Sequence, residues 1–300
     1  MDGATLAVTT LPLISPMCDL TGRLVTGEGV GVRVPPAGQA TSIHALEVDG
    51  EVVLQVRHET DGRVTGLLSV LGPENAPDQA GIITQDMVGG QAACSDRSFT
   101  SYGSKESDDR LWYYNSDTDP TVGSPAALYH ERGVTSAVVN LLAGYNDCGL
   151  AGGFRASQTY LGNTTARSNI SSDSTCNGLD GVNVVDWGSI NNADHLGLTC
   201  RYDFLLDLPG YEEIIEADIK IGNKHSYLAA LPTSACENSY DVMALMTHEW
   251  GHAFGLGHTP DPAADHRQQT MNPYLTACST FQRTLGRGDW TGMNTVYGPR

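Results

Sequence analysis

The pattern of apolar and polar positions in the first ninety residues is typical of short β-strands. Apolar residues alternate with polar ones, with interruptions, between turns rich in glycine and proline. The clearest strands are predicted at residues 24–26, 30–34, 51–56 and 64–70. A glycine-containing interval near residues 88–91 is the best candidate for a domain boundary. We therefore predict a small β-rich N-terminal region over residues 1–91 and a larger domain over residues 92–300.

The second region mixes strand and helix periods. Strands are predicted at residues 111–115, 182–188 and 199–204. Apolar residues at helical spacing predict an amphipathic helix over residues 125–145. The same spacing predicts a second, buried helix that begins near residue 241. These elements indicate an α+β class.

The second helix carries the most informative motif of the chain, H-E-x-x-H-x-x-G-x-x-H at residues 248–258. His248 and His252 are four residues apart, so their rings project from one helix face and can reach one metal ion. Glu249 is rotated by about 100° and can contact a metal-bound water without binding the metal. Gly255 permits a positive φ, so the helix can end and the chain can turn to bring His258 back as a third ligand. The motif predicts a catalytic zinc site.

This motif resembles the signature of the metzincin zinc proteases, and three further landmarks resemble the matrixins. These are A-D-I-K-I at residues 217–221, T-M-N-P around Met271, and D-W-T-G-M-N-T-V-Y-G at residues 289–298. The resemblance implies a twisted mixed sheet with an antiparallel edge strand, a long packing helix, an active-site helix and a C-terminal helix. It covers about residues 92–300.

The resemblance also implies a function and a set of site residues. It implies a secreted zinc metalloendopeptidase with one catalytic ion held by His248, His252 and His258, and with Glu249 as general base. Gly255 and Met271 would support the site. The substrate-binding edge strand would consist of Ala217, Asp218, Ile219, Lys220 and Ile221. The alternative is a non-proteolytic binding protein that keeps the metzincin scaffold.

The chain departs from the matrixin pattern at several positions. The interval before the active-site helix holds only His225, so we predict no structural zinc. Tyr274 stands one place early after Met271 and receives no role. Near Cys18 the sequence lacks the arginine and glycine of a cysteine switch. Residues 1–91 are therefore either a propeptide or a retained accessory domain.

Composition narrows the partners and the compartment. A net charge of −18 disfavours nucleic acid and anionic membrane surfaces, which would repel the protein. No stretch of 18 apolar residues is present, so we expect no membrane insertion. The resemblance implies action on proteins or peptides, and we expect a monomer. Six of the seven cysteines lie in the matrixin-like region, which suggests up to three disulfides and an oxidising compartment. Their pairing is open, because six cysteines allow 15 arrangements.

Other polar residues have weaker signals. Two oxygen-rich loops could bind calcium, although Asp and Asn are also the usual turn formers, which is the favoured interpretation. They contain Asn115, Asp117 and Asp119, and Asp173, Asn177 and Asp180. Five histidines show no ligand spacing, and we expect them at the solvated surface. These are His44, His58, His130, His195 and His266.

Overall fold

The computed structural model describes most of the chain. It covers residues 5–11, 13–14, 19–48, 50–71, 91–192, 194–205, 210–259, 266 and 268–300. Cys18 and most of the expected boundary interval near residues 88–91 lie outside these residues. The division of the chain at residue 91 therefore stays a prediction.

One mixed sheet dominates the described part of the chain. Its first five strands, in spatial order, are β11 (Ser157–Asn163), β10 (Asp109–Tyr114), β13 (Asn183–Gly188), β15 (Glu212–Gly222) and β14 (His195–Phe204). The first four strands run parallel, and β14 is antiparallel to β15. This arrangement confirms the predicted mixed sheet and its antiparallel strand.

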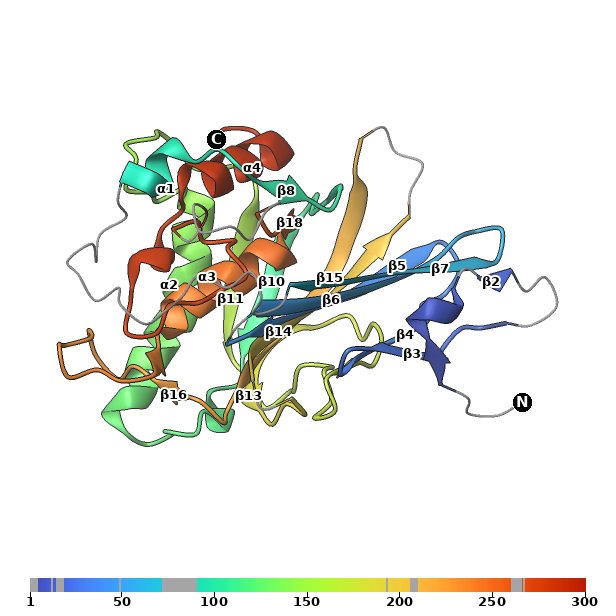
Figure 1. The fold of residues 1–300 in the computed structure, drawn as a ribbon, viewed down its shortest axis with the longest axis horizontal. Helices are drawn as coiled ribbons and strands as arrows, with labels where there is room; N and C mark the ends of the chain where they lie inside the picture. The colour runs from blue at the N-terminus through green and yellow to red at the C-terminus, as the bar shows by residue number, and fades with distance from the viewer. Residues whose placement is uncertain are drawn as a thin grey trace.

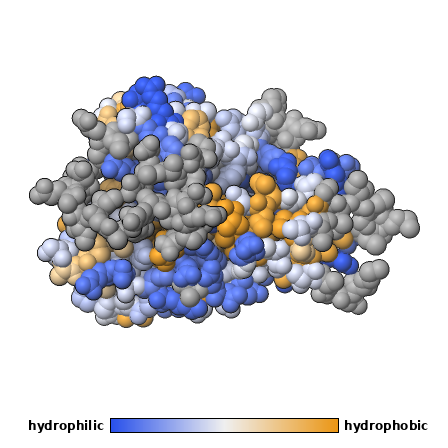
Figure 2. All heavy atoms as spheres, viewed as in Figure 1, coloured by the Kyte–Doolittle hydropathy of each residue, from blue (hydrophilic) through white to orange (hydrophobic). Residues whose placement is uncertain are grey.

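The N-terminal region continues the same sheet beyond β14. In order these strands are β5 (Gln39–Glu47), β6 (Gly50–His58), β7 (Arg63–Leu71) and β2 (Leu13–Ile14). Strand β5 pairs antiparallel with the whole of β14. In Figure 1 these blue strands extend away from the helices, and Figure 2 shows apolar residues gathered in a band over them. The predicted β-rich character of this region is confirmed, with β6 and β7 at two of the predicted strands.

A second, small sheet covers one face of the N-terminal strands. It has the order β1 (Leu6–Ala7), β3 (Leu24–Gly27), β4 (Val30–Arg33) and β12 (Thr175–Cys176). Val25 and Val32 of this sheet are buried in one cluster with Ile43, Leu54 and Leu198. The N-terminal region and β14 therefore share a hydrophobic core, and burial of its side chains stabilises their association.

Three helices pack on the other side of the first five strands of the large sheet. They are α2 (Pro125–Ala143), α3 (Val242–Ala253) and α4 (Arg287–Tyr297), drawn green, orange and red in Figure 1. Helix α2 begins with Ser124, whose hydroxyl accepts the Ala126 N–H, and it ends at Gly144 in the left-handed region. Val138 on α2 lies in one buried core with Trp112 and Trp250. The predicted amphipathic helix is confirmed.

The remaining elements are short, and three disulfides connect the loops. Helix α1 spans Gln91–Ser95, and the short strands are β8 (Thr100–Ser101), β9 (Ser104–Lys105), β16 (Ser226–Tyr227), β17 (Ser239–Tyr240) and β18 (Leu256–Gly257). Single 3₁₀ turns are η1 (Val8–Thr10), η3 (Ser116–Thr118) and η5 (Phe281–Arg283). The disulfides are Cys94–Cys148, Cys176–Cys200 and Cys236–Cys278, as many as the sequence suggested. Within the described residues, none of the helices has the length and apolar character needed to cross a bilayer.

Candidate metal centre

Helix α3 places the first two histidines. The helix begins at the N-cap Asp241, whose carboxylate accepts the Ala244 N–H and pairs with Arg283. His248 and His252 lie one turn apart on the same face, and both side chains are buried. Their Nε2 atoms are 3.0 Å apart. The helix spacing alone is therefore sufficient to bring two imidazole nitrogens to one point.

A turn after α3 supplies the third histidine. Gly255 has φ 89°, and its N–H donates to the His252 carbonyl at 3.0 Å. A Cβ at this position would meet the carbonyl of Ser104. The chain then runs through β18, and His258 Nε2 comes to 3.2 Å from His248 Nε2 and 3.0 Å from His252 Nε2. The reversal depends on a left-handed residue without a side chain.

Hydrogen bonds to the other ring nitrogens orient two of the imidazoles. His248 Nδ1 donates to the Thr270 carbonyl at 2.8 Å, and His252 Nδ1 donates to the Leu256 carbonyl at 3.0 Å. Because a carbonyl only accepts, Nδ1 carries the proton and Nε2 presents its lone pair. Burial lowers the pKa of all three histidines, which favours the neutral rings that bind metals.

The geometry of the three nitrogens fits a zinc ion. A tetrahedral zinc with Zn–N bonds of about 2.0–2.1 Å requires ligand nitrogens about 3.3 Å apart. The observed separations of 3.0–3.2 Å are close to this value. Nitrogen lone pairs that converge on one point repel one another unless a cation lies between them. The arrangement of the three histidines therefore favours metal binding.

Glu249 lies beside the three histidines, on the first helical turn of the motif. Its Oε2 accepts a hydrogen bond of 2.5 Å from Thr199 Oγ1 on β14, while Oε1 has no hydrogen-bond partner among the described residues. Burial raises the pKa of this carboxyl to about 7. Arg201, also on β14, donates to the His252 carbonyl at 3.3 Å. Strand β14 thus supports both the carboxylate and the end of the helix.

Met271 and Asp289 form a layer beneath the histidines. The sulfur of Met271 packs so closely on α3 that a Cβ at Gly251 would clash with it. Asp289, at the start of α4, accepts the backbone N–H groups of Thr270 and Met271 at 2.6 and 3.1 Å. Thr270 in turn holds the His248 ring. Asp289 therefore fixes the turn that orients the His248 ring, a role that sequence reasoning did not assign.

A fourth side chain reaches the cluster from the N-terminal region. Glu51, near the start of β6, is fully buried, and its Oε2 is in direct contact with His258 Nε2. Its carboxylate oxygens lie 3.5 Å from His252 Nε2 and 3.7 Å from His248 Nε2. Glu51 and the three histidines form the one group of potential metal ligands found among the described residues. No spacing in the sequence pointed to Glu51.

Comparison with known proteins agrees with this geometry. A family model described as matrixin matches residues 108–298. The chain belongs to the matrixin family. Human matrix metalloproteinase-20 is 33% identical over 63 residues, which are 21% of this chain and 12% of that protein. The matched stretch is therefore a small part of the length of this curated relative.

In this matrixin, the predicted position of residues 217–221 at an edge of the sheet is wrong. Ala217–Ile221 were expected at the edge of the sheet, but they lie inside β15, which pairs with β13 on one side and β14 on the other. Both edges of β15 are therefore occupied. The strand that lies next to α3 is β14, and its second edge pairs with β5. The motif identified a strand of the sheet, whereas the order of strands depends on partners distant in sequence.

The expectation of surface positions for the other histidines is also wrong. His44, His58, His130 and His195 are buried. Each makes a polar contact, such as the 2.9 Å pair between His130 and Asp119 and the 2.8 Å pair between His195 and Glu47. Each of these imidazoles therefore uses at least one ring nitrogen inside the fold, while His130 Nε2 and His195 Nδ1 have no hydrogen-bond partner among the described residues. His266 is partly buried and pairs with Asp96.

The candidate calcium loops form local turns. Asp119 accepts hydrogen bonds from the N–H and hydroxyl of Thr121, and Asp180 accepts the Val182 N–H. Asp173 bonds with Ser171. These bonds match the turn-forming interpretation of the two clusters, and calcium binding by either stays a prediction.

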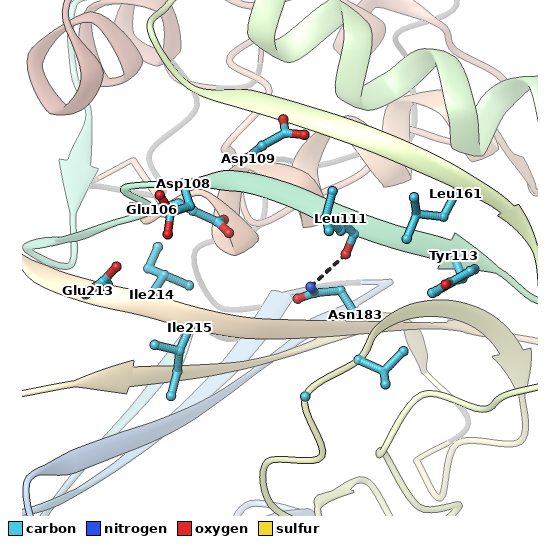
Figure 3. A pocket seen from close by; sticks show the side chains of 12 residues that line it. Glu106, Asp108, Asp109, Leu111, Tyr113, Leu161, Asn183, Glu213, Ile214 and Ile215 are labelled. Atoms are coloured by element: carbon cyan, nitrogen blue, oxygen red, sulfur yellow. Dashed lines mark hydrogen bonds between the residues drawn. The ribbon is translucent and has the colours of Figure 1, made fainter.

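A separate cavity of about 460 Å³ lies away from the histidines. Glu106 and Asp108 gather at one end, and Tyr113 lies at the other (Figure 3). Tyr113 follows Trp112 on β10, and Trp112 belongs to the core that α2 and α3 cover. Because successive strand residues face opposite sides, the cavity lies on the sheet face opposite the helices.

Proposed function

We propose that this matrixin is a zinc-dependent endopeptidase that hydrolyses internal peptide bonds. The observation that carries the proposal is the convergence of three neutral imidazoles beside the buried Glu249 carboxylate. This carboxylate accepts a hydrogen bond from Thr199 and does not join the histidine cluster. His248, His252 and His258 would hold one zinc ion. That ion supplies Lewis acidity and lowers the pKa of a water molecule toward about 7.

Glu249 would act as the general base and later as the general acid. Thr199 holds one of its carboxylate oxygens, which leaves Oε1 free of protein partners. This second oxygen can accept the proton of the attacking water and deliver it to the departing amine. Burial keeps competing solvent from the carboxylate.

Substrate would bind as a strand added to the catalytic sheet. The suitable strand is β14 rather than residues 217–221, because β14 carries Thr199 next to Glu249. An extended peptide paired with β14 would form main-chain hydrogen bonds along the sheet edge. The expected partners are therefore proteins or peptides.

A secreted location agrees with the three disulfides, which persist in oxidising compartments. We further propose that the enzyme acts as a monomer, since the histidines, Glu249, Thr199 and Asp289 all come from one chain.

Comparison of Glu249→Ala with the unaltered protein tests this function. Both full chains would be loaded with zinc and assayed on casein, as purified and after limited trypsin treatment followed by trypsin inhibition. We expect stoichiometric zinc in both proteins and cleavage only by the protein that keeps Glu249. A chelator should inhibit this cleavage, and added zinc should restore it. Cleavage by Glu249→Ala at the unaltered rate would refute the base. A zinc-loaded protein inactive in both states would favour a non-proteolytic binding scaffold.

A further inference from the structure

We propose that Glu51 is a fourth zinc ligand and that the β5–β6 hairpin keeps the enzyme latent until the N-terminal region is displaced. This inference rests on the proposed endopeptidase function. It assigns an inhibitory role to residues 1–91, for which the sequence left a propeptide and an accessory domain open.

The Glu51 carboxylate is buried without a compensating hydrogen bond from the part of the chain that the structure describes. The side chain is fully buried, and neither oxygen has a hydrogen-bond donor among the described residues. An isolated carboxylate is costly to bury, and it is normally paired or bound to a metal. Here Oε2 lies in direct contact with His258 Nε2. The carboxylate oxygens also lie 3.5 Å from His252 Nε2 and 3.7 Å from His248 Nε2, close to the spacing of ligands that share one zinc ion.

Glu51 also lies where the fourth ligand of a zinc ion would bind. A catalytic zinc site has three protein ligands and keeps one position open, whereas a site with four protein ligands is closed. The ligand atoms of Glu51 and the three histidines all lie within 4.8 Å of one another. Glu51 therefore occupies the side of the cluster on which water must bind for hydrolysis.

The hairpin holds this carboxylate firmly. Glu51 pairs with Leu46 across the turn between β5 and β6. Strand β5 pairs with β14 from Gln39 opposite Phe204 to Glu47 opposite His195. His44 on β5 also stacks on the His252 ring, with centroids 4.4 Å apart. The carboxylate is thus delivered by a paired strand.

The same pairing blocks the substrate. Thr199, the β14 residue that holds Glu249, lies between Ile219 on one side and His44 on the other. The main-chain groups along this edge of β14 are paired with β5, so a substrate strand cannot be added there. Glu51 at the fourth zinc position would block water, and β5 at the edge of β14 would block the substrate strand. Removal of β5–β6 would relieve both obstacles.

Metal binding by the full chain tests the assignment of Glu51. The variants are Glu51→Ala, Glu51→Gln and the control Glu59→Gln. Glu59 lies in the same region but pairs with Arg57 away from the histidines. We expect both Glu51 variants to bind zinc at least tenfold more weakly than the unaltered protein in competition with a chelator. With cobalt in the site, Glu51→Ala should bind acetohydroxamate at least tenfold more tightly and with a changed visible spectrum.

Thermal stability provides a second readout that also controls for folding. Without metal, Glu51→Gln should melt at a higher temperature than the unaltered protein, because an uncompensated buried carboxylate is removed. With zinc the order should reverse, because a ligand is lost. Unchanged zinc affinity, cobalt spectrum and acetohydroxamate binding in both Glu51 variants would overturn the inference.

Latency is tested by asking whether the active enzyme still contains the N-terminal region. We expect peptide cleavage to rise at least tenfold when the N-terminal region is removed by limited proteolysis, with a new N-terminus beyond Leu71. Full activity from an enzyme that retains residues 1–91 would refute latency. Altered metal binding in the Glu51 variants without cleavage by any form would instead refute the proposed function and leave Glu51 as a structural ligand.

Discussion

Thr199 Oγ1 donates a hydrogen bond of 2.5 Å to Oε2 of Glu249. The two residues come from different elements, β14 and α3, and are 50 positions apart in the sequence. Both side chains are buried. The hydroxyl orients one carboxylate oxygen and leaves the other available for the reaction. Thr199 is therefore a positioning residue of the proposed general base.

Thr199→Val should lower kcat about ten- to a hundredfold, a part of the roughly 10²–10⁴-fold that a general base contributes. Valine keeps the shape of threonine and removes the hydroxyl that holds Glu249. We expect KM and zinc content to stay close to those of the unaltered enzyme. Thr199→Ser, which keeps the hydroxyl, should recover most of the rate in steady-state assays of processed enzyme. An unchanged kcat in Thr199→Val would show that the hydrogen bond does not matter for catalysis.

Asp289→Asn should weaken zinc binding about 10- to 100-fold, the usual effect of changing a group that orients a ligand. Asp289 accepts the N–H groups of Thr270, Met271 and Gly286, and Thr270 holds His248. Asparagine has one acceptor oxygen in place of two, so these bonds cannot all remain. Asp117→Asn, at an exposed position, is the matched control. Chelator competition measures the affinities, and equal values for both variants would contradict the role of Asp289.

Gly255→Ala should destabilise the protein by about 2–4 kcal/mol and reduce zinc retention, because two penalties add. Alanine is strained at φ 89°, and its Cβ would meet the Ser104 carbonyl. Gly62→Ala separates these penalties, since Gly62 has φ 83° and open space around it. We expect Gly62→Ala to cost only about 1 kcal/mol of backbone strain. Urea unfolding measures the free energy of unfolding of both variants. Equal losses in the two variants would show that the clash with Ser104 is absent.

Glu216 should make stability depend on pH between about 4.5 and 7. Burial raises the pKa of its carboxyl to about 7 in the folded protein, above the ordinary 4.5. Between these values the folded state keeps a proton that the unfolded state has released. The free energy of unfolding therefore falls as pH rises through this window and levels off above it.

Glu216→Gln removes this titration. Relative to the variant, the unaltered protein should lose on the order of 2 kcal/mol between pH 4.5 and 7.5, because one pKa unit corresponds to about 1.4 kcal/mol and solvent screening reduces the full effect of the shift. Urea unfolding of the metal-free proteins at several pH values measures the difference. Glu237→Gln, at an exposed position, should show the same pH dependence as the unaltered protein. A constant difference between Glu216→Gln and the unaltered protein would contradict the shifted pKa.

The sequence by itself predicted the features that depend on neighbouring residues. The spacing of His248, Glu249 and His252 acts through one helical turn, and Gly255 acts through its own backbone angle. The amphipathic helix and seven of the 18 described strands followed from periodicity in the same way. These features need no knowledge of partners distant in the chain, so the three histidines and the family resemblance could be read directly.

The tertiary structure alone decided which distant segments meet. Strand β5 was not predicted, because it is buried on both faces and includes Thr41, Ser42 and His44, so no alternation is visible. Its pairing with β14 brings Glu51 to the histidines, and the interior place of residues 217–221 follows from the same strand order. Strand pairing is set by main-chain hydrogen bonds and shared burial, which a local pattern does not encode. The sequence thus determined the candidate metal ligands of the helix and turn, and the fold determined what lies against them.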